Sequence, residues 1–466
     1  MKLAFVHGWS VHHTDTYGEL PRLLADRGLL RGLELDPVDI HLGRYISFDD
    51  TVRMDDVVRA FDRALHDALG YGKGGIAPFS CITHSTGGPV VREWLMRYHA
   101  PAMTKCPLQH LVMLAPANHG SALAALGSER LGRIKAWFEG IEPGEKILEW
   151  LELGSTPARA LNEDWLDLAP FAGGSAFMPF VLTGETIDSK LYDHVNSYTG
   201  EAGSDGVVRV AAANLAYSWL TLLQGDKKAA MTGGGEARLL EYDGKLRSSQ
   251  PSAFRIVPDA SHSGKKLGIL RSPTAANAGT KPVVAIILDA LSISTKTAYA
   301  ALAAAWAKAT DAEQAGTGKR RRFFQIIFQV TDDEGASVAD YDVLLLAGAK
   351  YDPDKLRKGF FVDKQSNKHS RERITFYLDY DVMMEVPDDQ FGFRIVARPD
   401  KGFAYYRPAE FRSVAKTLDA FVDPNTTLYV DIVLRRLVDD ETARFGPIDG
   451  APGEFKHVKP SGNLVD

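Results

Sequence analysis

Short apolar runs alternate with amphipathic segments along the first 120 residues, and this alternation limits the folds open to the chain. The runs at 3–8, 77–82 and 109–117 are typical of buried strands, and apolar residues recur at helical spacing in 17–30 and 51–70. Strands that are separated by helices usually pair in parallel, with the helices packed on both faces of the sheet. The pattern therefore predicts an α/β fold with a mostly parallel sheet.

Segment 121–176 interrupts this alternation. Several of its pieces have helical spacing, and strand patterns resume only at 176–184 and 253–262. A helical insertion between late strands of an α/β sheet often covers a binding site. We expect a helical lid here, and the alternative is a packed helical subdomain without a lid function.

The composition changes again at 310–322, a polar stretch rich in Ala, Gly, Lys and Arg. From residue 323 onward, β-branched and aromatic runs are separated by Asp, Gly and Pro, without amphipathic helices between them. Such a series is typical of an all-β sandwich or barrel. The sequence thus predicts a first domain at 1–309, a linker at 310–322 and a β-sandwich accessory domain at 323–466.

The composition excludes several classes of function. With 54 basic and 60 acidic residues the formal net charge is −6, so nothing marks the chain as a nucleic-acid binder. No apolar stretch approaches the ~18 residues of a membrane-spanning helix. The neighbouring His12 and His13 lack a matching set of further ligands, so neither a metal nor another cofactor is expected.

The apolar start of the chain is too short for a secretory signal, and it leads directly into a predicted core strand. We therefore expect a cytoplasmic protein, or one secreted without a cleaved N-terminal signal peptide. The sequence leaves the oligomeric state open.

The stretch "CITHSTGGPVV", residues 81–91, places Ser85 in a turn between a buried strand and a helix. A nucleophile elbow has this order, and small residues on both sides of its serine let the flanking backbones pass closely. Gly87 supplies the small residue after the serine, whereas Thr83 stands where a glycine is usual. Taken alone, the stretch is also compatible with an ordinary strand–turn–helix.

A serine nucleophile needs a base and an acid that orients the base, and later segments supply both. His262 follows a predicted strand in the polar loop "DASHSGKK", and Asp205 lies in a Gly-Ser-Asp-Gly turn. The alternatives are a surface-loop histidine and a turn that uses Asp for its conformation alone. Asp188, just after a predicted strand, is a competing acid. The chain order Ser85, Asp205, His262 favours a catalytic triad.

The oxyanion and substrate sites have candidates as well. The segment "VHGWS" ends an early strand, so that the amide of Trp9 can meet the amide of Thr86 and stabilise an oxyanion. We expect His84 to contact the substrate, together with the insertion residues Trp137 and Trp150. The apolar and aromatic side chains of the insertion suit a fatty-acyl substrate, and they suit plain helix packing equally.

The motifs "FVHGW", "THSTGG", "APANHGS", "SDGVV" and "ASHSG" resemble those of the α/β-hydrolase superfamily, and within it the lipase-like branch. The resemblance covers roughly residues 1–309 and leaves the β-rich C-terminal part unassigned. In that branch the first glycine of the elbow is often replaced, so Thr83 is a mild departure. The stretch "APANHGS", residues 115–121, is similar to the lipase loop that shapes the rim of the active site.

The resemblance implies a serine hydrolase that cleaves carboxylic esters through an acyl-enzyme. Ser85 would attack the ester carbonyl, His262 would carry the proton and Asp205 would hold the imidazole. We expect a lipase or esterase acting on acyl-lipid or polyester-like substrates, which would bring it against a lipid or polymer surface. A phospholipase, including one exported as an effector, and an acyltransferase could use the same triad. A non-catalytic binding protein on the hydrolase scaffold is the third alternative.

Overall fold

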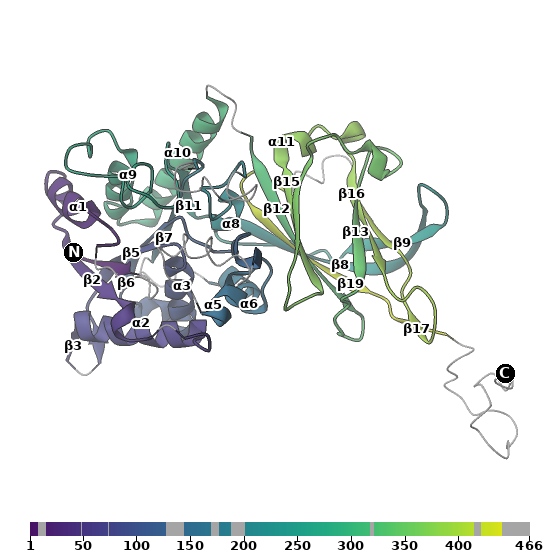
Figure 1. Cartoon of the computed structure of the whole chain (residues 1–466), viewed down its shortest axis with the longest axis horizontal. Coiled ribbons are helices and arrows are strands. Elements are labelled where there is room, and N and C mark those ends of the chain that lie inside the picture. Colours follow the sequence, from purple (N-terminus) through teal and green to yellow (C-terminus); the bar gives the residue numbers. More distant parts are fainter. Residues whose placement is uncertain are drawn as a thin grey trace, which may run out of the picture.

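The first sheet gives the chain its α/β core. The computed structural model describes residues 1–7, 15–47, 49–72, 74–126, 144–168, 177–187, 201–316, 321–413 and 421–439. Within these ranges six strands form a parallel sheet in the order β11-β7-β6-β5-β1-β2 (Figure 1). They are β1 (Lys2–His7), β2 (Asp36–His41), β5 (Phe79–His84), β6 (Leu108–Leu114), β7 (Met178–Thr183) and β11 (Ala253–Ile256). The prediction of an α/β-hydrolase core is confirmed.

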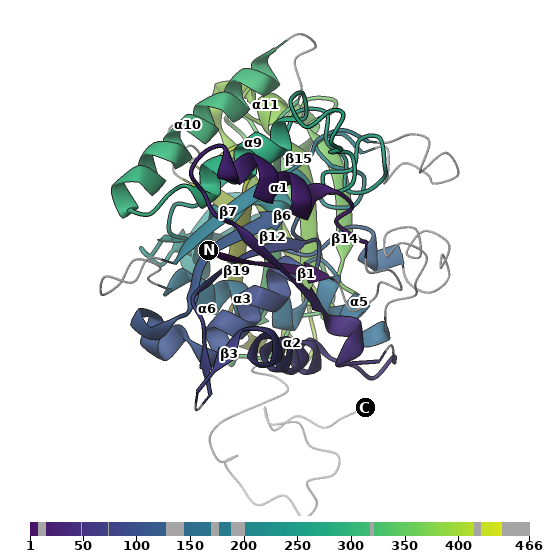
Figure 2. The same ribbon diagram turned by 90° about the vertical axis from the view of Figure 1, so that its left-hand side faces the viewer.

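The inner strands β1, β5, β6 and β7 of this sheet send side chains into two separate cores. In β1, Leu3 and Phe5 lie in a core with α1, α9 and α10, whereas Ala4 and Val6 lie in a core with α2 and α3. The helices are α1 (Leu20–Leu29), α2 (Met54–Leu69), α3 (Gly87–Tyr98), α9 (Pro282–Leu291) and α10 (Lys296–Ala315). Figure 1 and Figure 2 show these two helix layers on opposite faces of the sheet.

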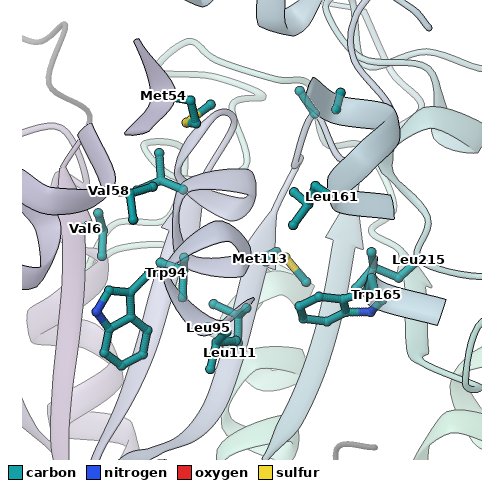
Figure 3. Packing of buried hydrophobic residues seen from close by; sticks show 14 of the residues in the cluster. Val6, Met54, Val58, Trp94, Leu95, Leu111, Met113, Leu161, Trp165 and Leu215 are labelled. Carbon is teal, nitrogen blue, oxygen red and sulfur yellow. The ribbon is translucent and has the colours of Figure 1, made fainter. Parts of the chain in front are cut away.

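The described helices of the expected lid belong to the second of these cores. Helices α5 (Glu145–Leu151) and α6 (Thr156–Leu166) bury Trp150, Leu161 and Trp165. Figure 3 shows Leu161 and Trp165 in this packing together with Met113 of β6. The expected substrate residue Trp137 lies outside the described residues, as does the rest of 127–143. This burial is compatible with a closed lid and with a packed subdomain, so the lid stays a prediction.

A second sheet forms the C-terminal β domain. Its described strands join in a ten-stranded sheet in the order β13-β16-β18-β9-β8-β19-β12-β15-β14, with β10 paired to β8. The strands are β8 (Tyr217–Ala230), β9 (Glu236–Tyr242), β10 (Arg247–Ser248), β12 (Phe323–Asp332), β13 (Tyr341–Ala347), β14 (Phe361–Ser366), β15 (Arg373–Asp379), β16 (Phe391–Ala397), β18 (Ala409–Arg412) and β19 (Thr427–Leu434). The continuous sheet curls around a core that includes Phe324, Phe328 and Phe376 (Figure 1). The all-β prediction for this part is confirmed.

Three strands of the second sheet, β8, β9 and the short β10, precede the expected domain boundary in the chain. β8 and β9 form an antiparallel hairpin, and β8 pairs in parallel with β19, so that Tyr217 lies opposite Thr427. The expected boundary at 309 therefore does not separate the two sheets. Helix α10 also continues to Ala315, so the first part of the expected linker 310–322 is helical. The boundary at 309 could not be placed correctly from the sequence, because a pairing between segments so distant in the chain leaves no local pattern.

Shorter elements connect the main ones. The 3₁₀ helices are η1 (Leu42–Arg44), η2 (Ala100–Lys105), η3 (Ala124–Leu126), η6 (Pro353–Lys355) and η7 (Pro387–Asp389). Single-turn helices are α8 (Val210–Ala213) and α11 (Tyr380–Met383), and short strand pairs are β3 (Gly70–Tyr71) with β4 (Gly75–Ile76) and β17 (Ala404–Tyr405) with β20 (Leu437–Val438). None of the helices in the described ranges is long and apolar enough to cross a bilayer.

A buried polar network joins the two sheets. Arg92 of α3 is fully buried and donates to the side-chain oxygens of Asn118 and Asn162, at 3.2 and 2.9 Å. The Nδ1 atom of His119 lies 2.9 Å from the hydroxyl of Tyr429 in β19, and burial lowers the pKa of His119 to about 3. Asn118 and His119 belong to the loop expected at the active-site rim. The structure instead buries both side chains at the junction of the sheets.

Removing the chain after Ala315 is expected to give insoluble protein. The deletion would remove β19 and β18, the strands that pair with β8 and β9, and would leave the edges of β8 and β9 unpaired. It would also expose the apolar residues Leu220 and Leu222. The measurement is the soluble fraction of the 1–315 fragment, compared with the full chain expressed in parallel. A soluble monomeric fragment with a cooperative melting curve would contradict this interpretation of the β8–β9 hairpin.

Candidate active site

Ser85 lies on a sharp turn between β5 and α3, as the nucleophile-elbow hypothesis requires. Its backbone has a φ of 52°, a conformation that residues other than glycine rarely adopt. A Cβ atom on Gly87 would lie 3.3 Å from the Cβ of Thr83, and one on Gly88 would lie 2.8 Å from the Cβ of Pro116. Gly87 therefore leaves the space that the Thr83 side chain takes up before the serine, and Gly88 lets the start of α3 approach Pro116.

The structure brings the three residues of the expected triad together. The Nε2 atom of His262 lies 3.1 Å from Oγ of Ser85, and its Nδ1 atom lies 2.9 Å from Oδ2 of Asp205. His262 and Asp205 are completely buried, and Ser85 is 8% exposed. The serine comes from the end of β5, the histidine from the loop after β11 and the aspartate from the turn before α8. Asp188, the competing acid, lies outside the described residues.

Backbone amides fix the orientation of the Asp205 carboxylate. Oδ1 accepts hydrogen bonds from the amides of Val207 and Val208, at 3.0 and 2.8 Å, so that Oδ2 is directed to His262. The backbone amide of His262 also donates to the Asp205 carbonyl, at 3.0 Å. A carboxylate only accepts, so Nδ1 carries the hydrogen in the neutral imidazole. Nε2 is then left to accept the proton of Ser85.

His84 has a partner within the protein instead of an open position for substrate. Its Nε2 atom lies 3.0 Å from the carbonyl oxygen of His262, and the two rings lie 4.6 Å apart between centroids. A carbonyl only accepts, so Nε2 of His84 carries a hydrogen. Burial, with a smaller contribution from His262, holds the pKa of His84 well below its usual value. The side chain therefore supports the His262 loop as a neutral donor. The expected substrate contact of His84 stays a prediction.

The expected oxyanion donors are described only in part. Thr86 is the residue before α3, so its amide lies at the amino end of that helix, where the helix dipole favours negative charge. Trp9 lies outside the described residues. A small apolar cavity opens beside Thr86, and sequence reasoning did not identify it. Its lining consists of Leu42, Met54, Val57, Thr86, Gly87, Val90 and Ile147.

A larger cavity of about 540 Å³ lies between α2, α3, α5 and the turn after β14. Trp150, an expected substrate residue, contributes to its wall and is only 2% exposed. Met54 borders both this cavity and the small one beside Thr86. Glu93 of α3 also faces the larger cavity, and burial raises its pKa to about 7.

Replacing Glu93 by glutamine is expected to stabilise the protein at pH 8 and not at pH 5. The folded-state pKa of about 7 lies above the unfolded value, so the folded state binds more protons between them and stability falls as pH rises through this range. Glu93→Gln removes that loss, and its Tm at pH 8 should exceed that of the wild type by a few degrees. The control is Glu163→Gln, which changes an exposed carboxylate of α6. Equal Tm differences at both pH values would contradict the expectation.

The described residues hold no group of three or more His, Cys, Asp or Glu side chains placed to bind a metal ion. The side chains that the structure brings together at the site are the serine, the imidazole and the carboxylate. An activated hydroxyl can attack an acyl carbonyl, and the amides at a helix amino terminus beside it can stabilise the resulting oxyanion.

Two solved structures are similar to this chain over its whole length. A structure of the phospholipase PlaB from Legionella pneumophila has 44% identity and a TM-score of 0.86, covering 100% of this chain and 99% of its own. A structure of phospholipase PlaB from Legionella pneumophila in complex with thio-NAD has 42% identity, a TM-score of 0.85 and full coverage of both chains. No family model and no curated protein sequence matches the chain. The similarity includes the C-terminal β domain, which the sequence motifs left unassigned.

Proposed function

Since the chain belongs to the family of the Legionella pneumophila phospholipase PlaB and is a serine hydrolase of the lipase/esterase type, we propose that it cleaves acyl ester bonds of phospholipids. The observation that carries this proposal is the contact series from Ser85 through His262 to Asp205. Such a series activates a hydroxyl for attack on a carbonyl carbon, which favours cleavage of the acyl ester over the phosphodiester.

The mechanism has two steps. Ser85 Oγ attacks the ester carbonyl while Nε2 of His262 takes the proton, and Asp205 stabilises the imidazolium that forms. The amide of Thr86, together with that of Trp9, stabilises the oxyanion. His262 then protonates the leaving alkoxide of the lysophospholipid. Water attacks the acyl-enzyme, with His262 again as base, and releases the fatty acid.

The apolar cavity beside Thr86 is the proposed site of the acyl chain. Thr86, the proposed oxyanion donor, is one of its lining residues. The cavity measures only about 10 Å³, which is room for about one water-sized group, so an acyl chain that extends from the reacting carbonyl enters it only if the lining side chains move apart. Each CH₂ group that leaves water contributes about 0.8 kcal/mol, which favours long acyl chains over short ones. The apolar lining, rather than the present size of the cavity, favours a lipid ester as the substrate class.

Phosphatidylcholine vesicles test the proposed reaction directly. We expect free fatty acid and lysophosphatidylcholine as products of the wild type, and no phosphocholine. The same vesicles with added long-chain alcohol separate hydrolysis from acyl transfer, since a transferase would form a fatty-acyl ester of the alcohol. Release of phosphocholine, or turnover that the Ser85→Ala variant retains, would contradict the proposal.

Filling the acyl cavity is expected to change chain-length preference. Val90→Phe places a larger side chain in the cavity, so kcat/KM for a p-nitrophenyl C8 ester should fall about tenfold or more. The C2 ester has no chain to place and should change by about twofold at most. Val91→Phe is the control, because Val91 is equally buried on α3 and does not line the cavity. A parallel loss on both esters would show that this cavity does not hold the acyl chain.

A further inference from the structure

The first residues of the turn that carries Asp205 pack against the second sheet. The hydroxyl of Tyr377 in β15 donates to the carbonyl of Gly203, at 3.0 Å, and its ring stacks on that of Phe323 in β12. A Cβ atom on Gly203 would lie 2.2 Å from Phe323 and 2.5 Å from the Tyr377 hydroxyl. Only glycine allows so close an approach. The backbone two residues before Asp205 is therefore fixed by the C-terminal β domain.

Arg209 holds the end of the same turn in place through buried ion pairs. Its side chain is 2% exposed and donates to both carboxylate oxygens of Glu201, at 2.8 and 2.9 Å. It also donates to Asp363 of β14, and its guanidinium carbon lies 4.2 Å from the centroid of the Tyr377 ring. A buried guanidinium is costly unless it is paired, so the position of Arg209 depends on these partners.

The two ends of this turn are also hydrogen-bonded to each other. The amide of Val210 donates to the carbonyl of Gly203, at 2.9 Å, and Ser204 pairs with Arg209 in an isolated antiparallel bridge. Asp205 therefore lies in a closed loop whose base is held by β12, β14 and β15. A displacement of that base would move the carboxylate that faces His262.

We propose that Tyr377 and Asp363 of the C-terminal β domain are positioning residues for the hydrolytic reaction, acting through Asp205. The inference rests on the proposed catalytic roles of Ser85, His262 and Asp205, and it does not depend on the lipid substrate. The second sheet then positions the catalytic acid, a role that goes beyond that of the accessory domain predicted from the sequence. A misplacement of about 1 Å can cost on the order of 100-fold in rate.

The first test compares Asp363→Asn with a control in the same sheet. Asp363→Asn removes the charge that faces Arg209, and kcat on p-nitrophenyl acetate should fall about tenfold to 100-fold with KM within about twofold. Asp363→Glu keeps the charge and should recover most of the kcat. The control is Glu410→Gln, which breaks a buried ion pair with Arg394 away from the Asp205 loop. It should lower Tm and leave kcat per folded molecule unchanged.

A double-mutant cycle separates positioning from a structural role. In the Asp205→Asn background, Asp363→Asn should cost no further activity, because the group it positions is already lost. Tyr377→Phe keeps the ring and removes only the hydroxyl. It should lower kcat as a single variant and cost no further activity in the Asp205→Asn background, so it replaces Asp363→Asn in the test if that variant does not fold. Additive losses in both cycles, or an unchanged kcat in both single variants, would overturn the inference. If Asp205→Asn itself retains full activity, Asp205 is not the acid of the triad, and the proposed function is contradicted instead of the positioning role.

Discussion

Replacing Ser85 by alanine is expected to lower kcat on p-nitrophenyl acetate by about 10⁵–10⁶, which is the loss seen when a triad nucleophile is removed. Oγ of Ser85 is the atom that Nε2 of His262 faces, at 3.1 Å. Alanine has no atom that can form the acyl-enzyme. The measurement is the initial rate of the purified variant under substrate saturation.

The fold of this variant should survive. Serine and alanine have the same steric difficulty at φ of 52°, and only one oxygen atom is removed. The Tm of Ser85→Ala should therefore match that of the wild type within a few degrees. Turnover above about one thousandth of the wild-type kcat in a folded variant would contradict the elbow assignment.

Replacing Asp205 by asparagine should lower kcat by about 10⁴, because it changes the tautomer of His262. The amides of Val207 and Val208 donate to one carboxylate oxygen, so asparagine should place its carbonyl oxygen there. Its NH₂ group then faces Nδ1 of His262, which must become an acceptor. Nε2 would carry the hydrogen and could no longer take the proton of Ser85.

The comparison for this variant is Asp188→Asn, the competing acid from the sequence. Asp188→Asn should leave kcat within about threefold of the wild type, because Nδ1 of His262 is hydrogen-bonded to Oδ2 of Asp205. The measurement is kcat for both variants on the same ester, with Tm as a control for folding. The opposite ranking would assign the acid role to Asp188.

The sequence predicted much of the site because an elbow leaves a local pattern. The buried strand before Ser85, the paired glycines after it and the later Asp-Gly turn and loop histidine are each visible within about ten residues. Their order along the chain then predicts that they meet at the same edge of a parallel sheet. The structure places Ser85, Asp205 and His262 within hydrogen-bonding distance, as that order predicts.

The contribution of the second sheet could not be predicted in this way. Strand β8 pairs with β19 across most of the second half of the chain, and such a pairing has no signal in either segment. Nothing near Tyr377 or Asp363 in sequence indicates that they touch the turn of Asp205. One local signal exists: Arg209 interrupts the apolar stretch "GVVRVAAA", and a charge in such a stretch usually indicates a buried partner.

The contact of His84 with the His262 loop could not be predicted, for a related reason. Its place beside the nucleophile suggested contact with substrate, whereas its ring nitrogen meets the carbonyl of His262 from a loop almost 180 residues later in the chain. The position next to Ser85 is a local fact, and the direction of the side chain depends on a loop that only the fold brings near.

Labelling with a fluorophosphonate probe tests the central claim most directly, because the probe reacts with an activated serine whatever the natural substrate is. After labelling, proteolysis and mass spectrometry identify the modified residue. We expect a single adduct on Ser85 in the wild type and none in Ser85→Ala, with Asp205→Asn labelled far more slowly. Labelling at another serine, or equal labelling of wild type and Ser85→Ala, would contradict the assignment of Ser85, His262 and Asp205 as the catalytic residues.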